Sequence, residues 1–323
     1  MPDPDLHTHH VNDTRTSGRG AAQAGRWGTD YFRMATRSPR YRWWVPLIEV
    51  ALLYVGYLAL VFVVVMIATA LKLVAPDHTN FIQGVGNQAG IAPSKPIDFT
   101  LTTLSLIILV PAAMFAVRYG GRRPVGGLFA VCGWLNTSLL WRSTKLILPV
   151  YVVSTAVPMF FFDYTFSITA SALIGALLVV ILIPLQAAAE EVAFRGLMGQ
   201  VLGAWTKTPV IPIVLPVIPF LLAHSYDFSG MFALAVFSIC MGILLWVTGG
   251  LEIPMVMHAI SNMTALFPVA FGAGAVSDTV SLTVVVYQSA LTIGLTVLII
   301  LRPQVVGVTS WKTSSAPEGK TAS

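Results

Sequence analysis

Long stretches without a single charged residue constrain this chain more than any other feature of its sequence. Charge-free runs extend over 50–71, 99–117, 124–141, 146–162, 164–189, 208–226, 228–251, 253–277 and 279–301. Each is near or above the length of about 17 to 25 residues with which an apolar helix crosses a hydrocarbon core about 30 Å thick. Only 10% of the residues are charged, whereas a soluble protein carries roughly a quarter. The chain is therefore predicted to be an all-α, polytopic membrane helix bundle.

The run at 124–141 is the one that does not fit a membrane span. It contains three glycines and a polar triplet at 136–138, which favours an interfacial or re-entrant segment. Lys and Arg next to spans are retained on the cytoplasmic side. If this run does not cross, about eight transmembrane helices result, and all Lys and Arg except Lys72 and Lys95 lie on the cytoplasmic side. The sequence thus predicts a multi-pass protein of the plasma membrane with both termini in the cytoplasm.

Three regions follow from this topology. Residues 1–43 form a polar cytoplasmic tail that lacks the apolar core of a signal peptide and is predicted to be disordered. The transmembrane bundle occupies 44–302, and 303–323 form a second polar tail. Glu49 and Glu252 lie at the ends of spans, where they are predicted to reach water or headgroups. The net charge of +5 reflects this topology, and we expect the bilayer, not nucleic acid, as the partner.

Ionisable residues inside the apolar runs are rare. Such a side chain costs at least about 2.5 kcal/mol on insertion scales, so one that persists in a bilayer is a candidate for function. Most acidic residues of this chain lie near the ends of the runs. The exceptions fall in three segments, which carry first Glu190, Glu191 and Arg195, then His224, and then His258 and Asn262.

Helical spacing predicts how these groups face one another. Glu191 and Arg195 are four residues apart, so they share a helix face and are predicted to form a charge-assisted pair, whereas Glu190 points about 100° away. Glu190 is then predicted to face a cavity with an unpaired carboxylate. His258 and Asn262 also share a face. Carboxylate, imidazole and amide groups together suit hydrolysis, because they supply a base that activates water and donors that hold an oxyanion.

The three segments can cooperate only if the helices are not all short and straight. In straight spans Glu190 would lie near the cytoplasmic end of its helix and His224 near the external end of the next one. We therefore expect either that the helix of Glu190 is long and tilted, with its apolar stretch continuing to Trp205, or that the proline-rich helix before His224 enters obliquely. The polar side chains of the three segments are predicted to converge within hydrogen-bonding or one-water reach.

The order of the motifs resembles a known family. EExxxR, FxxxH and HxxxN, each on a different apolar segment, resemble the CPBP family of intramembrane proteases, the CAAX-protease and bacteriocin-processing or Abi family, over about residues 100–300. The resemblance implies an endopeptidase of the CAAX prenyl type that acts on a membrane-anchored protein or peptide. By motif position, Glu190 and His224 would activate the attacking water, His258 and Asn262 would stabilise the oxyanion, and Arg195 would orient Glu190 and Glu191.

The resemblance leaves the cofactor open, because the family has been described both as metalloproteases and as metal-independent glutamate enzymes. If zinc is bound, its ligands would be Glu190, His224 and His258. However, the zinc-binding HExxH pattern is absent from the sequence and Asn is a poor zinc ligand. The sequence favours water activation without a metal, with zinc as the alternative.

Two other functions are consistent with the same residues. A proton-coupled transporter or channel also buries Glu, His and Arg, but no inverted repeat is evident in the sequence. A non-catalytic immunity or chaperone relative of the family is the second alternative, against which the three intact motifs argue. The intramembrane endopeptidase is the leading hypothesis.

Overall fold

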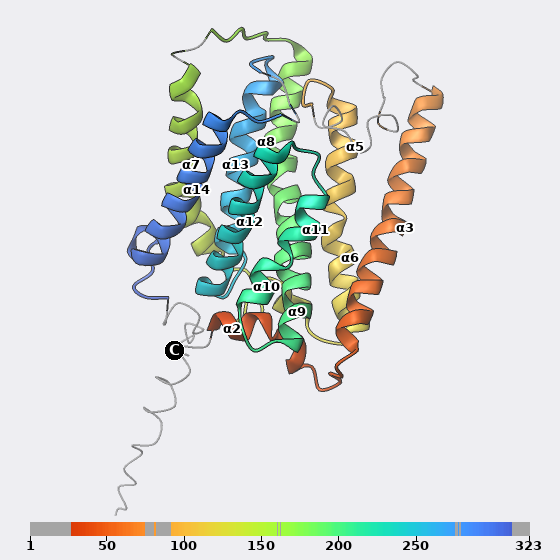
Figure 1. Ribbon diagram of the computed structural model, residues 1–323. Coiled ribbons are helices and arrows are strands. Elements are labelled where there is room, and N and C mark those ends of the chain that lie inside the picture. The colour runs from red at the N-terminus through yellow and green to blue at the C-terminus, as the bar shows by residue number, and fades with distance from the viewer. Residues whose placement is uncertain are drawn as a thin grey trace, which may run out of the picture.

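The fold is a bundle of helices. The computed structural model describes residues 27–74, 81, 92–159, 161, 163–274, 277 and 279–311. Within these ranges every regular element is a helix, and the one β interaction is an isolated antiparallel bridge between Ala130 and Gly250 (Figure 1). The all-α prediction is confirmed.

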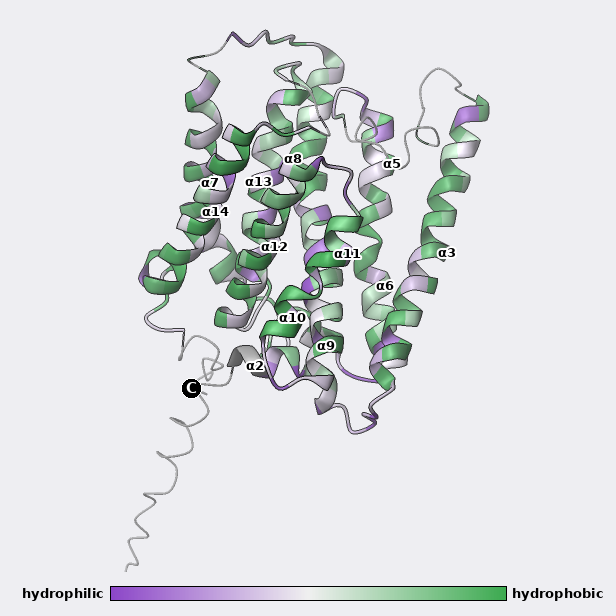
Figure 2. Ribbon diagram, viewed as in Figure 1, coloured by the Kyte–Doolittle hydropathy of each residue, from purple (hydrophilic) through white to green (hydrophobic). Residues whose placement is uncertain are grey.

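Six helical segments of the described chain are long and apolar enough to cross a membrane. They are α3 (Val45–Val74); α5 (Pro96–Ile107) with α6 (Leu109–Phe115) and the π-helix η3 (Ala116–Gly120); α8 (Ala170–Glu190) with the π-helix η5 (Glu191–Met198) and α9 (Gly199–Trp205); α12 (Phe228–Thr248); α13 (Glu252–Ala270); and α14 (Leu282–Leu301). Hydrophobic residues dominate these helices (Figure 2), and the chain is a multi-pass membrane protein.

The predicted number of about eight spans is not confirmed, because two further segments fall short by length or composition. Helix α7 (Thr137–Met159) carries Arg142 and Lys145 near its start, which lowers its hydropathy. Helices α10 (Val210–Val214) and α11 (Val217–Leu222) form a broken and shorter apolar segment. Pro216 lies at the break, where a proline lacks the backbone N–H that a continuous helix would use. Both segments nonetheless lie within the bundle in Figure 1.

Residues 124–141 do not cross the bundle, as the sequence predicts. They form the short 3₁₀ helix η4 (Val125–Leu128), an irregular stretch and the first turn of α7. The irregular stretch pairs with the connection between α12 and α13, since the Val131 N–H donates to Gly249 O at 2.9 Å and the Leu251 N–H donates to Phe129 O at 2.8 Å. This segment therefore packs against the α12–α13 turn.

The prediction of a disordered tail over 1–43 is wrong for the part that the structure describes. Helix α2 (Trp27–Phe32) and the 3₁₀ helix η1 (Met34–Arg37) pack under the bundle (Figure 1). Phe32 is buried against α9, where its backbone and Cβ fill the space that a side chain at Gly203 would need. The ring of Phe32 lies against Gly199 of the same helix. Sequence composition did not reveal these contacts of Phe32 with two glycines. Residues 1–26 lie outside the described residues.

Tyr31 closes the same end of the bundle. Its hydroxyl donates to Leu128 O, and the side chain is fully buried. Burial away from water raises the pKa of Tyr31, so the phenol stays protonated and able to donate. Helix α2 is thereby fixed to η4 as well as to α9.

Glu49 and Glu252 do not reach headgroups, which corrects the prediction made from their position near span ends. Both are at most 3% exposed. Arg123 donates from Nε and Nη2 to the two oxygens of Glu49 at 2.9 and 2.8 Å, and from Nη1 to Gln200 Oε1 at 2.7 Å. Glu252 Oε1 accepts from the Asn136 N–H at 2.8 Å. These carboxylates persist in the interior because each has a protein donor.

The carboxyl-terminal segment is partly structured. The 3₁₀ helix η6 (Pro303–Val306) follows α14, and Val306 is fully buried. The indole of Trp311 donates to Ile299 O at 3.2 Å, which ties the chain back to α14. Residues 312–323 of the predicted polar tail lie outside the described residues.

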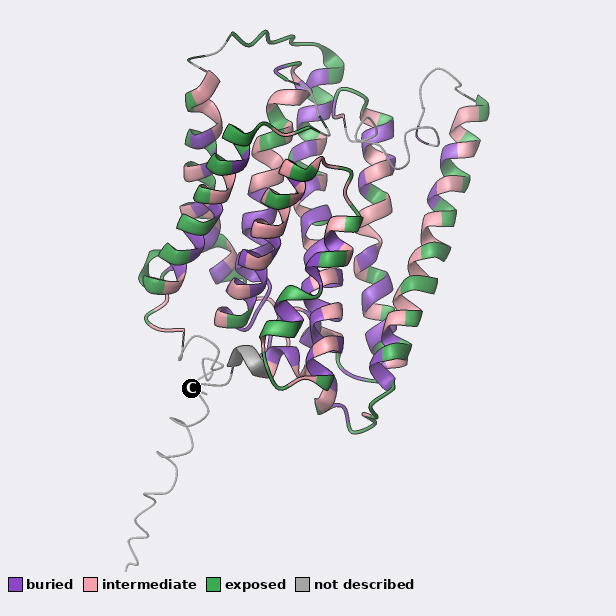
Figure 3. Cartoon of the chain, viewed as in Figure 1, coloured by how far each residue is buried: buried purple, intermediate pink, exposed green. Residues whose placement is uncertain are grey.

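Two packing arrangements place the helices that matter for the site. Helix α13 packs between α7 and α8, so it lies inside the bundle. Helix α3 packs mainly on α6 and η3, and much of its surface is exposed (Figure 3). Because α13 and α8 pack on each other, the side chains that they direct at one another are shielded from lipid.

Replacing Phe32 with Ala should destabilise the protein by about 3–5 kcal/mol, because it leaves a cavity between α2 and α9. A thermal unfolding curve of the purified protein in detergent measures the effect. Trp43→Ala is the control, since that ring is 69% exposed, and it should change stability little. Equal melting temperatures for Phe32→Ala and the unchanged protein would contradict the packing of α2.

Candidate active site

One helix of 36 residues carries the glutamate pair. Residues Ala170–Trp205 run continuously through α8, η5 and α9. At 1.5 Å per residue, Glu190 lies about 30 Å from the start of this helix and about 22 Å from its end. The helix is as long as the first of the two expected arrangements requires, which places Glu190 deep in the bundle, and its tilt stays a prediction.

The helix widens where the motif begins. Glu191 opens the π-helix η5, which contains Arg195 and ends at Met198. Short π segments within α-helices are frequent at functional sites, since they change the direction of side chains relative to a regular α-helix. All of Glu190, Glu191 and Arg195 are at most 5% exposed. The motif is thus buried at an irregularity of the helix.

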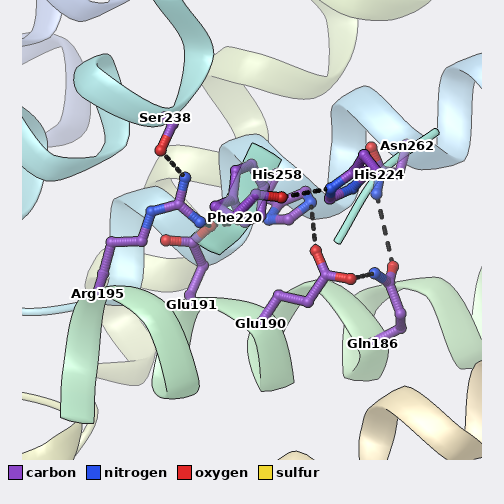
Figure 4. Close-up of polar contacts among 9 residues, drawn as sticks. All are labelled: Gln186, Glu190, Glu191, Arg195, Phe220, His224, Ser238, His258 and Asn262. Atoms are coloured by element: carbon purple, nitrogen blue, oxygen red, sulfur yellow. Dashed lines mark hydrogen bonds and ion pairs between the residues drawn. The ribbon is translucent and has the colours of Figure 1, made fainter. Parts of the chain in front are cut away.

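Glu191 is the paired anion of the site. Arg195 Nη1 donates to Glu191 Oε1 at 3.1 Å, and His258 Nδ1 lies 2.8 Å from the same oxygen (Figure 4). Arg195 is itself held by Ser238 Oγ, at 2.8 Å from Nη2, and its guanidinium lies 4.0 Å from the centre of the Phe220 ring. The predicted pair of Glu191 and Arg195 is present.

Glu190 has a different environment from Glu191, but its carboxylate is not unpaired, which corrects the prediction. Gln186 Nε2 donates to Glu190 Oε1 at 2.5 Å. The other oxygen, Oε2, lies 3.5 Å from His258 Nε2, within ion-pair distance, but it has no hydrogen-bond partner among the described residues. Glu190 therefore presents one fixed and one open carboxylate oxygen inside the bundle.

Helix α13 contributes His258 and Asn262 from one face. The two nitrogens of His258 face different carboxylates, with Nδ1 toward Glu191 and Nε2 toward Glu190. Asn262 Nδ2 donates to Gln186 Oε1 at 3.5 Å. Residues from α8, η5 and α13 are thus joined in one polar cluster.

The ring of Phe220 lies near both His224 and His258 of this cluster. His224 follows the end of α11, where its Nδ1 lies 2.8 Å from Phe220 O. The Phe220 ring lies 4.8 Å from the His224 ring and 6.2 Å from the His258 ring, measured between centroids. None of the hydrogen bonds of the described residues joins His224 to Glu190, His258 or Asn262, so the convergence predicted for His224 remains a prediction.

The donors do not assemble into a metal site. Within the described ranges, no group of three or more His, Cys, Asp or Glu side chains is placed to hold a metal ion. His258 directs both nitrogens at carboxylates and His224 Nδ1 faces a backbone carbonyl. Glu190, His224 and His258 do not form such a group in this arrangement, and zinc binding by them stays a prediction.

Sequence reasoning did not identify three residues that hold the side chains of the glutamate motif. Gln186 lies four residues before Glu190, and the same spacing rule that paired Glu191 with Arg195 could have found it. Ser238 on α12 and the ring of Phe220 both hold Arg195, but they lie far from it along the chain. No local spacing could have indicated those two contacts.

A comparison with protein families agrees with the motif order. Residues 169–264 match the family described as type II CAAX prenyl endopeptidase Rce1-like. The matched range contains Glu190 to Asn262, and therefore all three motifs. This part of the chain is similar to that family, and the match supports a peptidase. Neither the curated proteins nor the solved structures gave a match.

Arg195→Met should destabilise the protein by about 3–5 kcal/mol, because it leaves the buried Glu191 carboxylate without its cation. The double variant Glu191→Gln with Arg195→Met should be more stable than Arg195→Met alone. Thermal unfolding in detergent measures both.

The exposed pair of Arg37 and Asp30 supplies a matched control, since its atoms are 3.4 Å apart and its side chains are 48% and 34% exposed. Arg37→Met should cost at most about 1 kcal/mol. Equal losses of stability in Arg195→Met and Arg37→Met would contradict the compensation of the Glu191 charge by Arg195.

Proposed function

We propose that this chain, with its Rce1-like region, is an intramembrane endopeptidase that hydrolyses a peptide bond of a membrane-associated protein or peptide. The observation that carries the proposal is that the two neighbouring glutamates, Glu190 and Glu191, have different partners. Glu191 Oε1 is bonded to Arg195 and to His258, whereas Glu190 has no arginine partner in these contacts. Oε2 of each glutamate lacks a hydrogen bond among the described residues, but only that of Glu190 is within ion-pair distance of an imidazole nitrogen, at 3.5 Å from His258 Nε2. Hydrolysis needs such a base with a free oxygen.

Glu190 is the proposed base. Gln186 holds Oε1, so Oε2 is the oxygen that takes a proton from the attacking water. His224 is proposed to bind the same water from the end of α11. Deprotonation makes the water a better nucleophile, which attacks the peptide carbonyl carbon, and Glu190 can return the proton to the leaving amine.

His258 and Asn262 are the proposed donors to the oxyanion. In this proposal His258 directs Nδ1–H to Glu191 and offers Nε2–H to the oxyanion. Asn262 Nδ2 has two hydrogens, and only one of them is directed to Gln186. The oxyanion therefore has two donors from one helix.

Glu191 and Arg195 act in this proposal through His258. Arg195 holds Glu191, and Glu191 in turn fixes the orientation of the imidazole by accepting from Nδ1. A carboxylate that orients an imidazole in this way is a common device in hydrolases. Zinc bound by Glu190, His224 and His258 is the untested alternative, and none of these steps depends on it.

Glu190→Gln should lower kcat by about 10²–10⁴-fold, since it removes the base but keeps the shape and the contact with Gln186. The assay uses purified protein in lipid vesicles with a membrane-anchored peptide library, offered in prenylated and unprenylated forms. A zinc chelator is expected to leave cleavage unchanged.

The matched control is Glu252→Gln. Glu252 is as deeply buried as Glu190 and accepts from the Asn136 N–H, a bond that a glutamine carbonyl can also accept. It should retain cleavage activity. Full cleavage by Glu190→Gln would contradict the proposed base. Absence of cleavage by the unchanged protein, together with a proton flux that Glu190→Gln abolishes, would favour the transporter.

A further inference from the structure

Gln186 connects the two functional helices. It is 7% exposed and lies on α8, one turn before Glu190. Its Nε2 donates to Glu190 Oε1 at 2.5 Å, and its Oε1 accepts from Asn262 Nδ2 on α13 at 3.5 Å (Figure 4). The side-chain amide thus lies between the proposed base and a proposed oxyanion donor.

The chemistry of an amide suits this position. A glutamine offers donors at one end and an acceptor at the other. An ionised Glu190 can only accept, so it selects the orientation of Gln186 with Nε2 toward Glu190. The Gln186 oxygen then faces α13 and selects the Nδ2 end of Asn262. The orientation of one carboxylate is thereby coupled to the orientation of the Asn262 amide on another helix.

We propose that Gln186 is a positioning residue of the active site, which holds Glu190 so that Oε2 faces the water and turns the Asn262 amide toward the oxyanion. The inference rests on the proposed endopeptidase function. The contact explains why one Glu190 oxygen is bonded and the other is open. It also explains why a buried glutamine is kept in an apolar helix, where its desolvation costs free energy unless both ends are bonded.

A second buried glutamine allows the role to be separated from simple packing. Gln200 lies on the same continuous helix, is 0% exposed and bonds to Arg123 and to Gly127 O at 2.7 and 2.6 Å. Unlike those of Gln186, these hydrogen bonds do not involve a proposed catalytic residue. Gln186→Met and Gln200→Met are therefore matched substitutions.

Gln186→Met should lower kcat by about 10-fold to 100-fold, because misplaced reacting groups lose rate of this order. KM should stay within about 2-fold, since Gln186 is not proposed to contact the peptide. Gln200→Met should keep kcat per folded molecule, whatever its effect on the melting temperature. The measurement is steady-state cleavage of a membrane-anchored peptide by vesicle-reconstituted protein.

A double-substitution cycle tests the link to α13. If Gln186 acts partly through Asn262, Asn262→Ala and Gln186→Met together should lower kcat by less than the product of their separate effects. Independent effects that multiply would overturn the coupling. An unchanged kcat in Gln186→Met, or an equal loss in Gln200→Met, would overturn the positioning role.

The outcomes also distinguish this inference from the proposed function. If the unchanged protein cleaves peptide and Glu190→Gln does not, while Gln186→Met cleaves normally, only the role of Gln186 fails. If Glu190→Gln cleaves as well as the unchanged protein, the proposed base fails and the positioning role fails with it.

Discussion

A charge inside a membrane protein must be compensated by the protein, because lipid offers neither water nor counterions. In this bundle, Arg195 meets that requirement for Glu191. The guanidinium is bonded to Ser238 of α12 and lies against the ring of Phe220 of α11, while His258 of α13 approaches the same carboxylate. The contacts of Arg195 and Glu191 thus link the helix that carries them to α11, α12 and α13.

The remaining architecture fixes the helix that carries this charge. A single helix from Ala170 to Trp205 brings Glu190 into the interior, and its lower end is held by α2 through the close fit of Phe32 at Gly203. The buried pair of Glu49 and Arg123 bonds to Gln200 of the same helix. The site therefore lies on a helix that is restrained both at its centre and near its end.

Local spacing in the sequence predicted much of this arrangement. The pair of Glu191 and Arg195, the non-spanning stretch at 124–141 and the all-helical class all depend on contacts or patterns within a few residues. Glu49 and Arg123 lie 74 positions apart in the chain, so no periodicity could pair them.

Single-turnover cleavage in H₂¹⁸O distinguishes a water activated by Glu190 from direct attack of the Glu190 carboxylate on the peptide. Mass spectrometry would follow the label in the products and in the protein. Direct attack by water predicts one ¹⁸O atom in the new peptide carboxylate and none in Glu190. Label found in the Glu190 carboxylate, with an unlabelled peptide product, would contradict the account.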